Sequence, residues 1–206
     1  QAPRGTLDQA ALAHPREYVD RIVATSPEQG IVTLDSDTSM SPGSLEAALH
    51  AIGAATLAVD EVMPRTVRNA FCGVRPPGHH AERGAAMGFC FFNNVAVGIR
   101  HALSAHGLER VALIDFDVHH GNGTQWIFYD DPGVLTVSVH ESGRHLFPGS
   151  GFPAETGGAG APGSSVNVAL APFAGDDLSP IHLSEPTRPY STSYPVLCLT
   201  SQNSDP

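Results

Sequence analysis

Lysine is absent from the 206-residue sequence, so all 11 fixed positive charges are arginine side chains. Charged residues make up only 16% of the chain, and 21 acidic side chains leave a formal net charge of −10. A protein this acidic repels the phosphate backbone of nucleic acids, which argues against direct nucleic-acid binding. The same charge attracts cationic ligands such as polyamines or basic peptides.

The sequence also lacks long hydrophobic runs and cysteine motifs. No stretch approaches the roughly 18 apolar residues of a membrane span, and the N-terminus lacks the basic, apolar and small-residue order of a signal peptide. The three cysteines, Cys72, Cys90 and Cys198, follow no CxxC spacing, which is typical of free thiols in a reducing compartment. We therefore expect a cytoplasmic protein with no membrane association, no disulfide framework and no cysteine zinc site.

The chain does contain enough apolar material for a folded core. Hydrophobic residues make up 41% of it, and 21 Gly and 17 Pro residues indicate long loops. Helical spacing predicts helices, and short apolar runs predict strands. The predicted helices span 8–25, 43–62, 92–106 and 123–129, and the predicted strands span 31–35, 70–74, 111–116, 134–140 and 166–170. Their alternation predicts an α/β fold with a parallel, doubly wound sheet flanked by helices.

The unusual residues divide the chain into a structured part and a tail. In a parallel sheet, functional residues gather beyond the carboxyl ends of the strands. The loops that follow these ends are 75–91, 116–123 and 140–165. Residues 178–206 instead hold five Pro and nine Ser or Thr without helical or strand periodicity. We therefore predict one domain over 1–177, followed by an irregular or disordered tail over 178–206.

Two adjacent histidines, His79 and His80, form the first candidate site. The preceding Pro77 and Gly78 suit the central positions of a type II turn, which would let both imidazoles converge on one cavity. Two neighbouring imidazoles disfavour each other's protonation, so one stays neutral while the other is cationic. Such a pair supplies a base and an acid at neutral pH. The alternative is a pair of surface histidines in a loop.

A second cluster of polar residues lies at the end of the apolar run 111–116 and directly after it. Asp117 and His119 are two residues apart, so in an extended segment both project to the same side and can share one divalent ion. Oxygen and nitrogen donors suit zinc. Asp115 lies further back on the strand, where it can accept a hydrogen bond from an imidazole N–H. The alternative is a polar strand-to-helix loop with incidental capping residues.

Aromatic residues in two of the loops predict an apolar channel. In the segment 87–94, we expect Phe91 and Phe92 to belong to the core, because four hydrophobic residues in a row are more often core than ligand contacts. Phe89 sits at the loop edge, and Phe147 in the third loop could supply the opposite wall. A narrow aromatic slot fits an extended alkyl chain with polar chemistry at its floor.

Several of these segments together resemble the histone deacetylase superfamily, which also contains acetylpolyamine amidohydrolases and acetoin-utilisation proteins. The segments are RPPGHHAERGAAMGFCFFNNVAVGIRHAL, IDFDVHHGNGTQ, SVHESGRHLFPGSG and, near residues 37–49, DTSMSPGSLEAAL. They occur in the right order and cover roughly residues 8–177, which makes the resemblance more specific than any one motif. Asn122, where some branches have Asp, looks like the class II-type and bacterial branches.

The resemblance implies an arginase-like α/β fold with zinc at the bottom of a tunnel. Asp117 and His119 match two of the family's three zinc ligands. His79 and His80 match its tandem catalytic histidines, and Asp115 matches the carboxylate that pairs with the first of them.

The resemblance also implies roles around this centre. Phe89 and Phe147 match the tunnel walls, and Gly88 matches a residue whose backbone contacts the substrate. Asn122 falls in the shell of residues behind the catalytic groups. Family members further carry monovalent-cation sites, here implying K⁺ at Asp115, Asp117, His119, Ser138 and Val139.

The implied reaction is metal-assisted hydrolysis of an acyl amide. The implied substrates are an acetylated lysine peptide, an acetylpolyamine or a small acylated amine. His80 is expected to act as the general base on a zinc-bound water, and protonated His79 or His80 then serves the leaving amine. The division of roles between the two histidines stays open at the level of sequence.

The sequence departs from the family pattern after Asp177. It contains neither the family's later Asp-bearing segment, which supplies the third zinc ligand, nor its Gly-rich loop with a catalytic Tyr. We therefore expect an incomplete fold, a fragment with roughly the N-terminal half of the domain, weak zinc binding, and low or no activity. A non-catalytic remnant or binding module is the alternative. An arginase-type hydrolase would need two metals bridged by several carboxylates, against which the single Asp-x-His loop argues.

Overall fold

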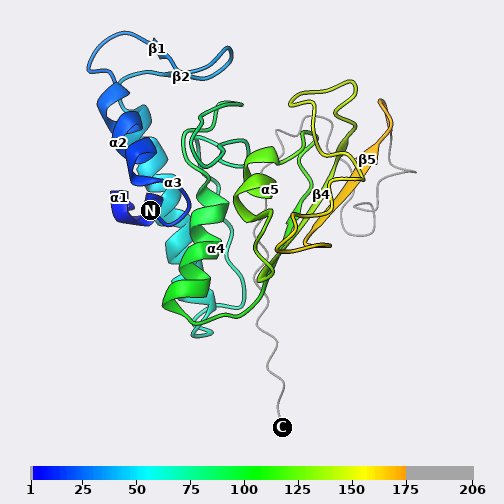
Figure 1. The fold of residues 1–206 in the computed structure, drawn as a ribbon. Helices are drawn as coiled ribbons and strands as arrows, with labels where there is room; N and C mark the ends of the chain where they lie inside the picture. Colours follow the sequence, from blue (N-terminus) through cyan, green and yellow to red (C-terminus); the bar gives the residue numbers. More distant parts are fainter. Residues whose placement is uncertain (1, 175–206) are drawn as a thin grey trace.

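The computed structural model describes residues 2–174, and within them the predicted α/β architecture is confirmed (Figure 1). The predicted tail over 178–206 and Cys198 lie outside the described residues. Among the residues described, no helix is both long and apolar enough to cross a membrane. The elements follow one another as α1 (Leu7–Ala10), α2 (Arg16–Thr25), β1 (Val32–Thr33), β2 (Ser39–Met40), α3 (Ser44–Val62), α4 (Asn94–Ala105), β3 (Val111–Asp115), α5 (Asn122–Phe128), β4 (Val134–Glu141) and β5 (Ser165–Leu170).

A three-stranded parallel sheet in the order β3–β4–β5 positions the loops. In its middle strand β4, Ser138 pairs with Asp115 of β3, and Val139 pairs with Val168 of β5. Residues of β3 alternate between buried and exposed, so Leu113 and Asp115 share the buried face. Because all three strands run in the same direction, their carboxyl ends lie along one edge of the sheet (Figure 1).

Three helices share one core with the buried face of this sheet. Ten of the 19 residues of α3 are buried, among them Leu49 and Ile52. One cluster of buried side chains joins these residues to Ile99 of α4, Phe128 of α5 and Leu113 of β3. The opposite face of the sheet leaves 37–49% of each of four apolar side chains exposed: Ile114, Leu135, Val166 and Val168.

Two predictions about individual elements are wrong, and a third is confirmed in part. The segment 8–25, predicted to be helical, forms two helices, because Pro15 lacks an N–H and disfavours helical backbone at the residue before it, and the second helix begins directly after Pro15. The segment 70–74 forms no strand; a short apolar run needs a neighbouring strand, and Phe71 is instead 76% exposed. The strand expected over 31–35 shrinks to β1, which pairs antiparallel with β2 outside the parallel sheet.

A buried histidine joins the N-terminal helices to the loop that carries His79 and His80, called the histidine pair below. The Nδ1–H of His14 donates to the carbonyl of Arg83 at 3.1 Å, and its Nε2 accepts the backbone N–H of Asn93 at 2.9 Å. An accepting Nε2 carries no proton, so this bridge exists only with a neutral imidazole. Burial lowers the pKa of His14 to about 4, which keeps it neutral at pH 7.

The buried His14 predicts a loss of stability in acid. Between pH 6.5 and about 4 the unfolded chain binds a proton that folded His14 does not. The free energy of unfolding therefore decreases as the pH is lowered through this range. For one such group the slope reaches about 1.4 kcal/mol per pH unit. Since His14→Gln removes this term, the stability difference between the native protein and the variant should narrow as pH falls through this window. Urea unfolding from pH 7.5 to 4.5 measures it, and a constant difference would contradict the prediction.

Candidate active site

The candidate site lies where three loops meet at the carboxyl edge of the sheet. The histidine pair comes from the loop before α4, Asp117 and His119 from the loop after β3, and Phe147 from the loop after β4. The ring centroid of His80 lies 5.9 Å from that of His119 and 5.0 Å from that of Phe147. Residues from three separate sequence segments therefore face one another.

A tight turn places both histidines in the interior. The N–H of Ala81 donates to the carbonyl of Gly78 at 3.0 Å, so His79 and His80 occupy the two centres of this turn. Their rings lie 4.0 Å apart, and both residues are buried. The type II turn predicted at Pro77–Gly78 is wrong, because Gly78 does not have the positive φ that such a turn requires. Gly78 is needed for space instead, since a Cβ there would lie 2.6 Å from the backbone nitrogen of Asn94.

Each histidine of the pair has a different hydrogen-bond partner. Nδ1–H of His79 donates to Oδ2 of Asp115 at 2.8 Å. Nδ1 of His80 lies 2.8 Å from Oδ1 of Asn122, whose Nδ2 donates to Glu82 at 3.0 Å. Since the amide oxygen of Asn122 only accepts, His80 also carries its proton on Nδ1. One imidazole therefore contacts a carboxylate and the other a neutral amide, with Nε2 left to each ring for chemistry.

These partners drive the two pKa values apart. Burial alone would lower the pKa of His79, but the charge and hydrogen bond of Asp115, with the charge of Asp117, raise it above the usual 6.5. Burial first, and then the charge of His79, lower the pKa of His80 to about 3. The two shifts make His79 the more basic ring and keep His80 neutral at pH 7.

Asp117 and His119, called the ligand pair below, present an oxygen and a nitrogen side by side. Nδ1 of His119 lies 3.1 Å from Oδ1 of Asp117, and the backbone N–H of His119 donates to the same oxygen at 2.9 Å. The backbone N–H of Asp117 donates to Oδ1 of Asp115 at 3.0 Å, which ties this loop to the strand end. Burial alone would raise the pKa of Asp117, but the hydrogen bonds from His119 and the charge of His79 lower it, so the carboxylate stays ionised.

The donor set of the ligand pair fits zinc. A tetrahedral ion with bonds of about 2.0–2.1 Å holds neighbouring ligand atoms about 3.3 Å apart. The 3.1 Å between Oδ1 of Asp117 and Nδ1 of His119 is close to this value. Within residues 2–174, no third His, Cys, Asp or Glu brings a ligand atom within 4.8 Å of both. The described residues would therefore offer two ligands to the predicted zinc ion.

Residues predicted to line a channel surround His80. The ring of Phe147 stands edge-on to those of both His80 and His119. Gly88 adopts a φ of +58°, and a Cβ on it would lie 2.4 Å from Cδ2 of His80, so no side chain fits there. Phe89 is 62% exposed, and its place in the wall of a channel stays a prediction. Phe91 and Phe92 are buried in the core, as predicted.

Comparison with known proteins identifies the family. The sequence profile of the histone deacetylase domain matches residues 1–200. The chain belongs to the histone deacetylase family. It is 40% identical over 174 residues to a probable deacetylase of Archaeoglobus fulgidus, covering 84% of this chain and 47% of that protein. It is 42% identical over 176 residues to a histone deacetylase-like amidohydrolase of Pseudomonas aeruginosa, covering 85% of this chain and 46% of that protein.

A solved structure of the family shares the fold. The crystal structure of the HDA15 HD domain superposes with a TM-score of 0.78 at 39% sequence identity, covering 82% of this chain and 49% of that one. The predicted deacetylase-like fold is thus confirmed. The chain spans about half the length of the curated relatives and of this structure.

Two contacts of the candidate site were not predicted from the sequence. The carboxylate of Asp37 accepts the backbone N–H of Gly88 at 3.1 Å, and the hydroxyl of Thr38 accepts that of Phe89 at 3.0 Å. Both glycine and phenylalanine lie at positive φ, which these bonds hold in place. The segment 37–49 contributed to the family resemblance, but no local signal shows which backbone groups its side chains reach.

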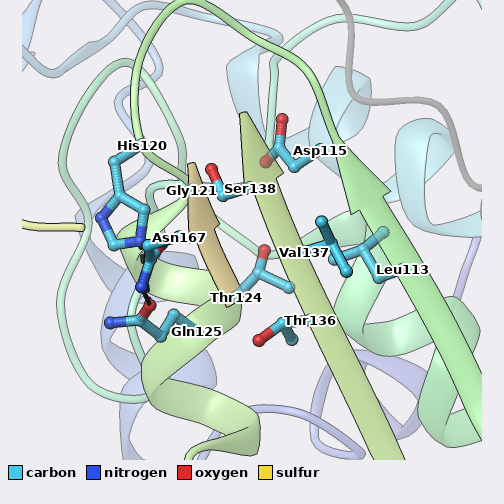
Figure 2. A pocket seen from close by; sticks show the side chains of 10 residues that line it. All are labelled: Leu113, Asp115, His120, Gly121, Thr124, Gln125, Thr136, Val137, Ser138 and Asn167. Carbon is cyan, nitrogen blue, oxygen red and sulfur yellow. Dashed lines mark hydrogen bonds between the residues drawn. The ribbon is translucent and has the colours of Figure 1, made fainter. Parts of the chain in front are cut away.

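Asp115 and Ser138 line a small cavity of about 10 Å³ at the carboxyl end of β3 and β4 (Figure 2). Of the five residues predicted to hold K⁺, these two line it. The other residues around it are Leu113, His120, Gly121, Thr124, Gln125, Thr136, Val137 and Asn167. Gln125 accepts hydrogen bonds from His120 at 3.1 Å and from Asn167 at 2.7 Å, so a buried polar network supports the site from beneath.

Gly121→Ala is expected to disrupt the contact between His79 and Asp115. A Cβ at residue 121 would lie 2.3 Å from Oδ2 of Asp115 and 3.3 Å from Nδ1 of His79, and the bond from Asp117 prevents Asp115 from moving away. We expect a loss of about 1–3 kcal/mol in the free energy of unfolding, measured with urea. Gly84→Ala, which meets no atom within 4 Å, is the control and should change it by about 0.5 kcal/mol or less. Equal stability of both variants would contradict the prediction.

Proposed function

We propose that this site hydrolyses an acyl amide, such as the acetyl group on a lysine side chain or a polyamine, with zinc held by the ligand pair. The observation that carries the proposal is the position of the histidine pair. Its two rings lie 4.0 Å apart and have oppositely shifted pKa values, and the ring of His80 lies 5.9 Å from that of His119. The names of the two curated relatives, a deacetylase and an amidohydrolase, support the same reaction class.

The residues divide the proton transfers between them. When bound, zinc polarises the acyl carbonyl and lowers the pKa of water toward about 7. Nε2 of His80 carries a lone pair, because Asn122 holds the ring proton on Nδ1, and can accept a proton from the attacking water. His79 keeps its proton beside Asp115 and can donate from Nε2 to the leaving amine. The opposite pKa shifts favour this assignment of base and acid.

The surroundings of the site favour a neutral acyl chain attached to a cationic body. Phe147 offers apolar surface beside His80 for an alkyl chain, and Phe89 presents an exposed apolar ring in the loop that follows the histidine pair. The net charge of −10 favours a positively charged remainder, as in a basic peptide or a polyamine. A cytoplasmic location, and K⁺ bound by Asp115, Asp117, His119, Ser138 and Val139, stay predictions.

A non-catalytic role is the second candidate. It is favoured by the absence, among residues 2–174, of a third ligand atom within 4.8 Å of the ligand pair. Two protein ligands hold zinc more weakly than three, so this role predicts folded protein without turnover.

An activity assay decides between the two. With excess zinc and an acetyl-lysine reporter peptide or an acetylpolyamine, we expect slow amide hydrolysis that His80→Ala lowers by about 10²–10⁴-fold, because the general base is lost. His50→Ala is the control, since His50 lies on α3, hydrogen-bonds the carbonyl of Ala2 and should leave the rate unchanged. A native rate no higher than that of His80→Ala on every substrate would rule out hydrolysis and favour the non-catalytic role.

A further inference from the structure

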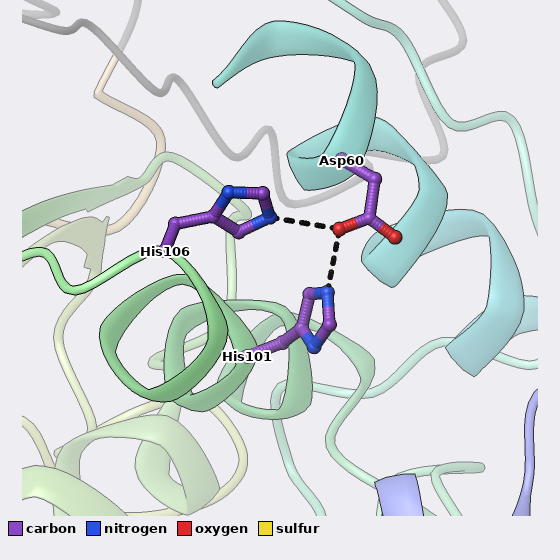
Figure 3. A group of neighbouring side chains, drawn as sticks. All are labelled: Asp60, His101 and His106. Carbon is purple, nitrogen blue, oxygen red and sulfur yellow. Dashed lines mark hydrogen bonds and ion pairs between the residues drawn. The ribbon is translucent and has the colours of Figure 1, made fainter. Parts of the chain in front are cut away.

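A second group of metal-binding side chains lies away from the candidate active site, at the end of the α3–α4 helix pair (Figure 3). Nε2 of His101 lies 2.7 Å from Oδ1 of Asp60, and Nε2 of His106 lies 2.8 Å from the same oxygen. Asp60 comes from the last turns of α3, whereas the histidines come from the end of α4. Within the described part of the chain, these are the only three His, Cys, Asp or Glu residues whose ligand atoms converge within 4.8 Å.

Rigid elements hold these three side chains. The two helices pack along their length through buried residues of the core, such as Leu49 and Ile99. His106 is the C-cap of α4, and Gly107 follows at a φ of +67°, which ends the helix at that point. The site is therefore preformed and does not need a loop to close.

The electrostatics of this place favour a cation. Both helices end here, and the carbonyl ends of helices carry partial negative charge. Neither α3 nor α4 has a basic residue in its last turn to balance it. Burial alone would raise the pKa of Asp60, but the hydrogen bonds from His106 and His101 lower it, so the carboxylate is ionised at neutral pH.

We propose that Asp60, His101 and His106 form a binding site for a divalent transition-metal ion, with Zn²⁺ as its representative, that links α3 to α4. Two imidazoles and one carboxylate are donors that zinc uses in proteins. The two rings stand at 80° to each other with centroids 5.6 Å apart, so they approach the carboxylate from different directions. The Asp60 side chain is 49% exposed, which leaves room for water to complete the coordination.

Binding of an ion by the neutral form of both imidazoles needs no external base. Each neutral imidazole has one ring proton, now on Nε2 in its hydrogen bond to Asp60. When Nε2 binds the ion, that proton moves to Nδ1 through solvent, and each ring stays neutral. The proposal does not rest on the deacetylase function, because it shares no residue with the histidine pair or the ligand pair.

Zinc titration of the full chain tests the proposal. Isothermal calorimetry is carried out on the native protein and on the double variant Asp117→Ala, His119→Ala, which removes the other candidate ligands. In both proteins we expect one zinc ion bound through Asp60, His101 and His106. Adding His101→Gln and His106→Gln should weaken that binding at least roughly tenfold, because two of three ligands are lost.

A thermal scan provides a second readout. Zinc at about 100 times its dissociation constant should raise the melting temperature by about 5–10 °C in proteins with an intact cluster. Asp60→Asn, which keeps the shape but loses the charge, should lose most of this rise even if the histidine variants fold poorly. His50→Gln is the matched control on α3, about 15 Å along the helix from Asp60, and should retain it. The proposal would be overturned if variants of Asp60, His101 and His106 bound zinc with the same affinity and showed the same rise in melting temperature as the protein with these residues intact.

Discussion

Two imidazoles in contact cannot both be protonated without strong repulsion, and the fold resolves this by giving them unlike partners. His79 donates to the carboxylate of Asp115, and His80 donates to the amide of Asn122. The carboxylate stabilises a cation and the amide does not, so one ring keeps a second proton and its neighbour stays neutral. Without this difference in partners, the site would contain two similar bases and no acid. The chemistry proposed for this deacetylase-family chain depends on that asymmetry.

The parallel sheet and a few close backbone approaches maintain the asymmetry. Asp115 is the last residue of β3, and Asn122 is the first residue of α5, so the two partners lie on either side of one short loop. Gly121 packs against Asp115, and Gly123 packs against the backbone of Ala81, where a Cβ would lie within 2.3 Å of existing atoms. These glycines bring the β3–α5 loop onto the turn that holds the histidines. The site is therefore shaped by backbone contacts as much as by side chains.

Several features of the fold and of the candidate site could be predicted from the sequence, because they depend on residues that are close together in the chain. The apolar run before Asp115 predicts a strand end, which β3 confirms. The spacing of Asp117 and His119 predicts two side chains that project to the same side, and the structure brings their Oδ1 and Nδ1 atoms within 3.1 Å of each other, while their role as metal ligands stays a prediction. Turn geometry and tertiary contacts are not local. The apolar segment 70–74 reads as a strand, but strand formation depends on a partner elsewhere in the chain. Likewise, Asp60 and His101 are 41 positions apart, and only the packing of two helices brings them together.

The most direct test of the central asymmetry is an NMR titration of the imidazoles of His79 and His80 in the metal-free full chain. The account predicts that His79 stays protonated above pH 6.5, whereas His80 stays neutral well below pH 6 and takes up a proton only near pH 3. Two rings that both titrate near the usual 6.5, or a His80 that holds its proton to higher pH than His79, would contradict it.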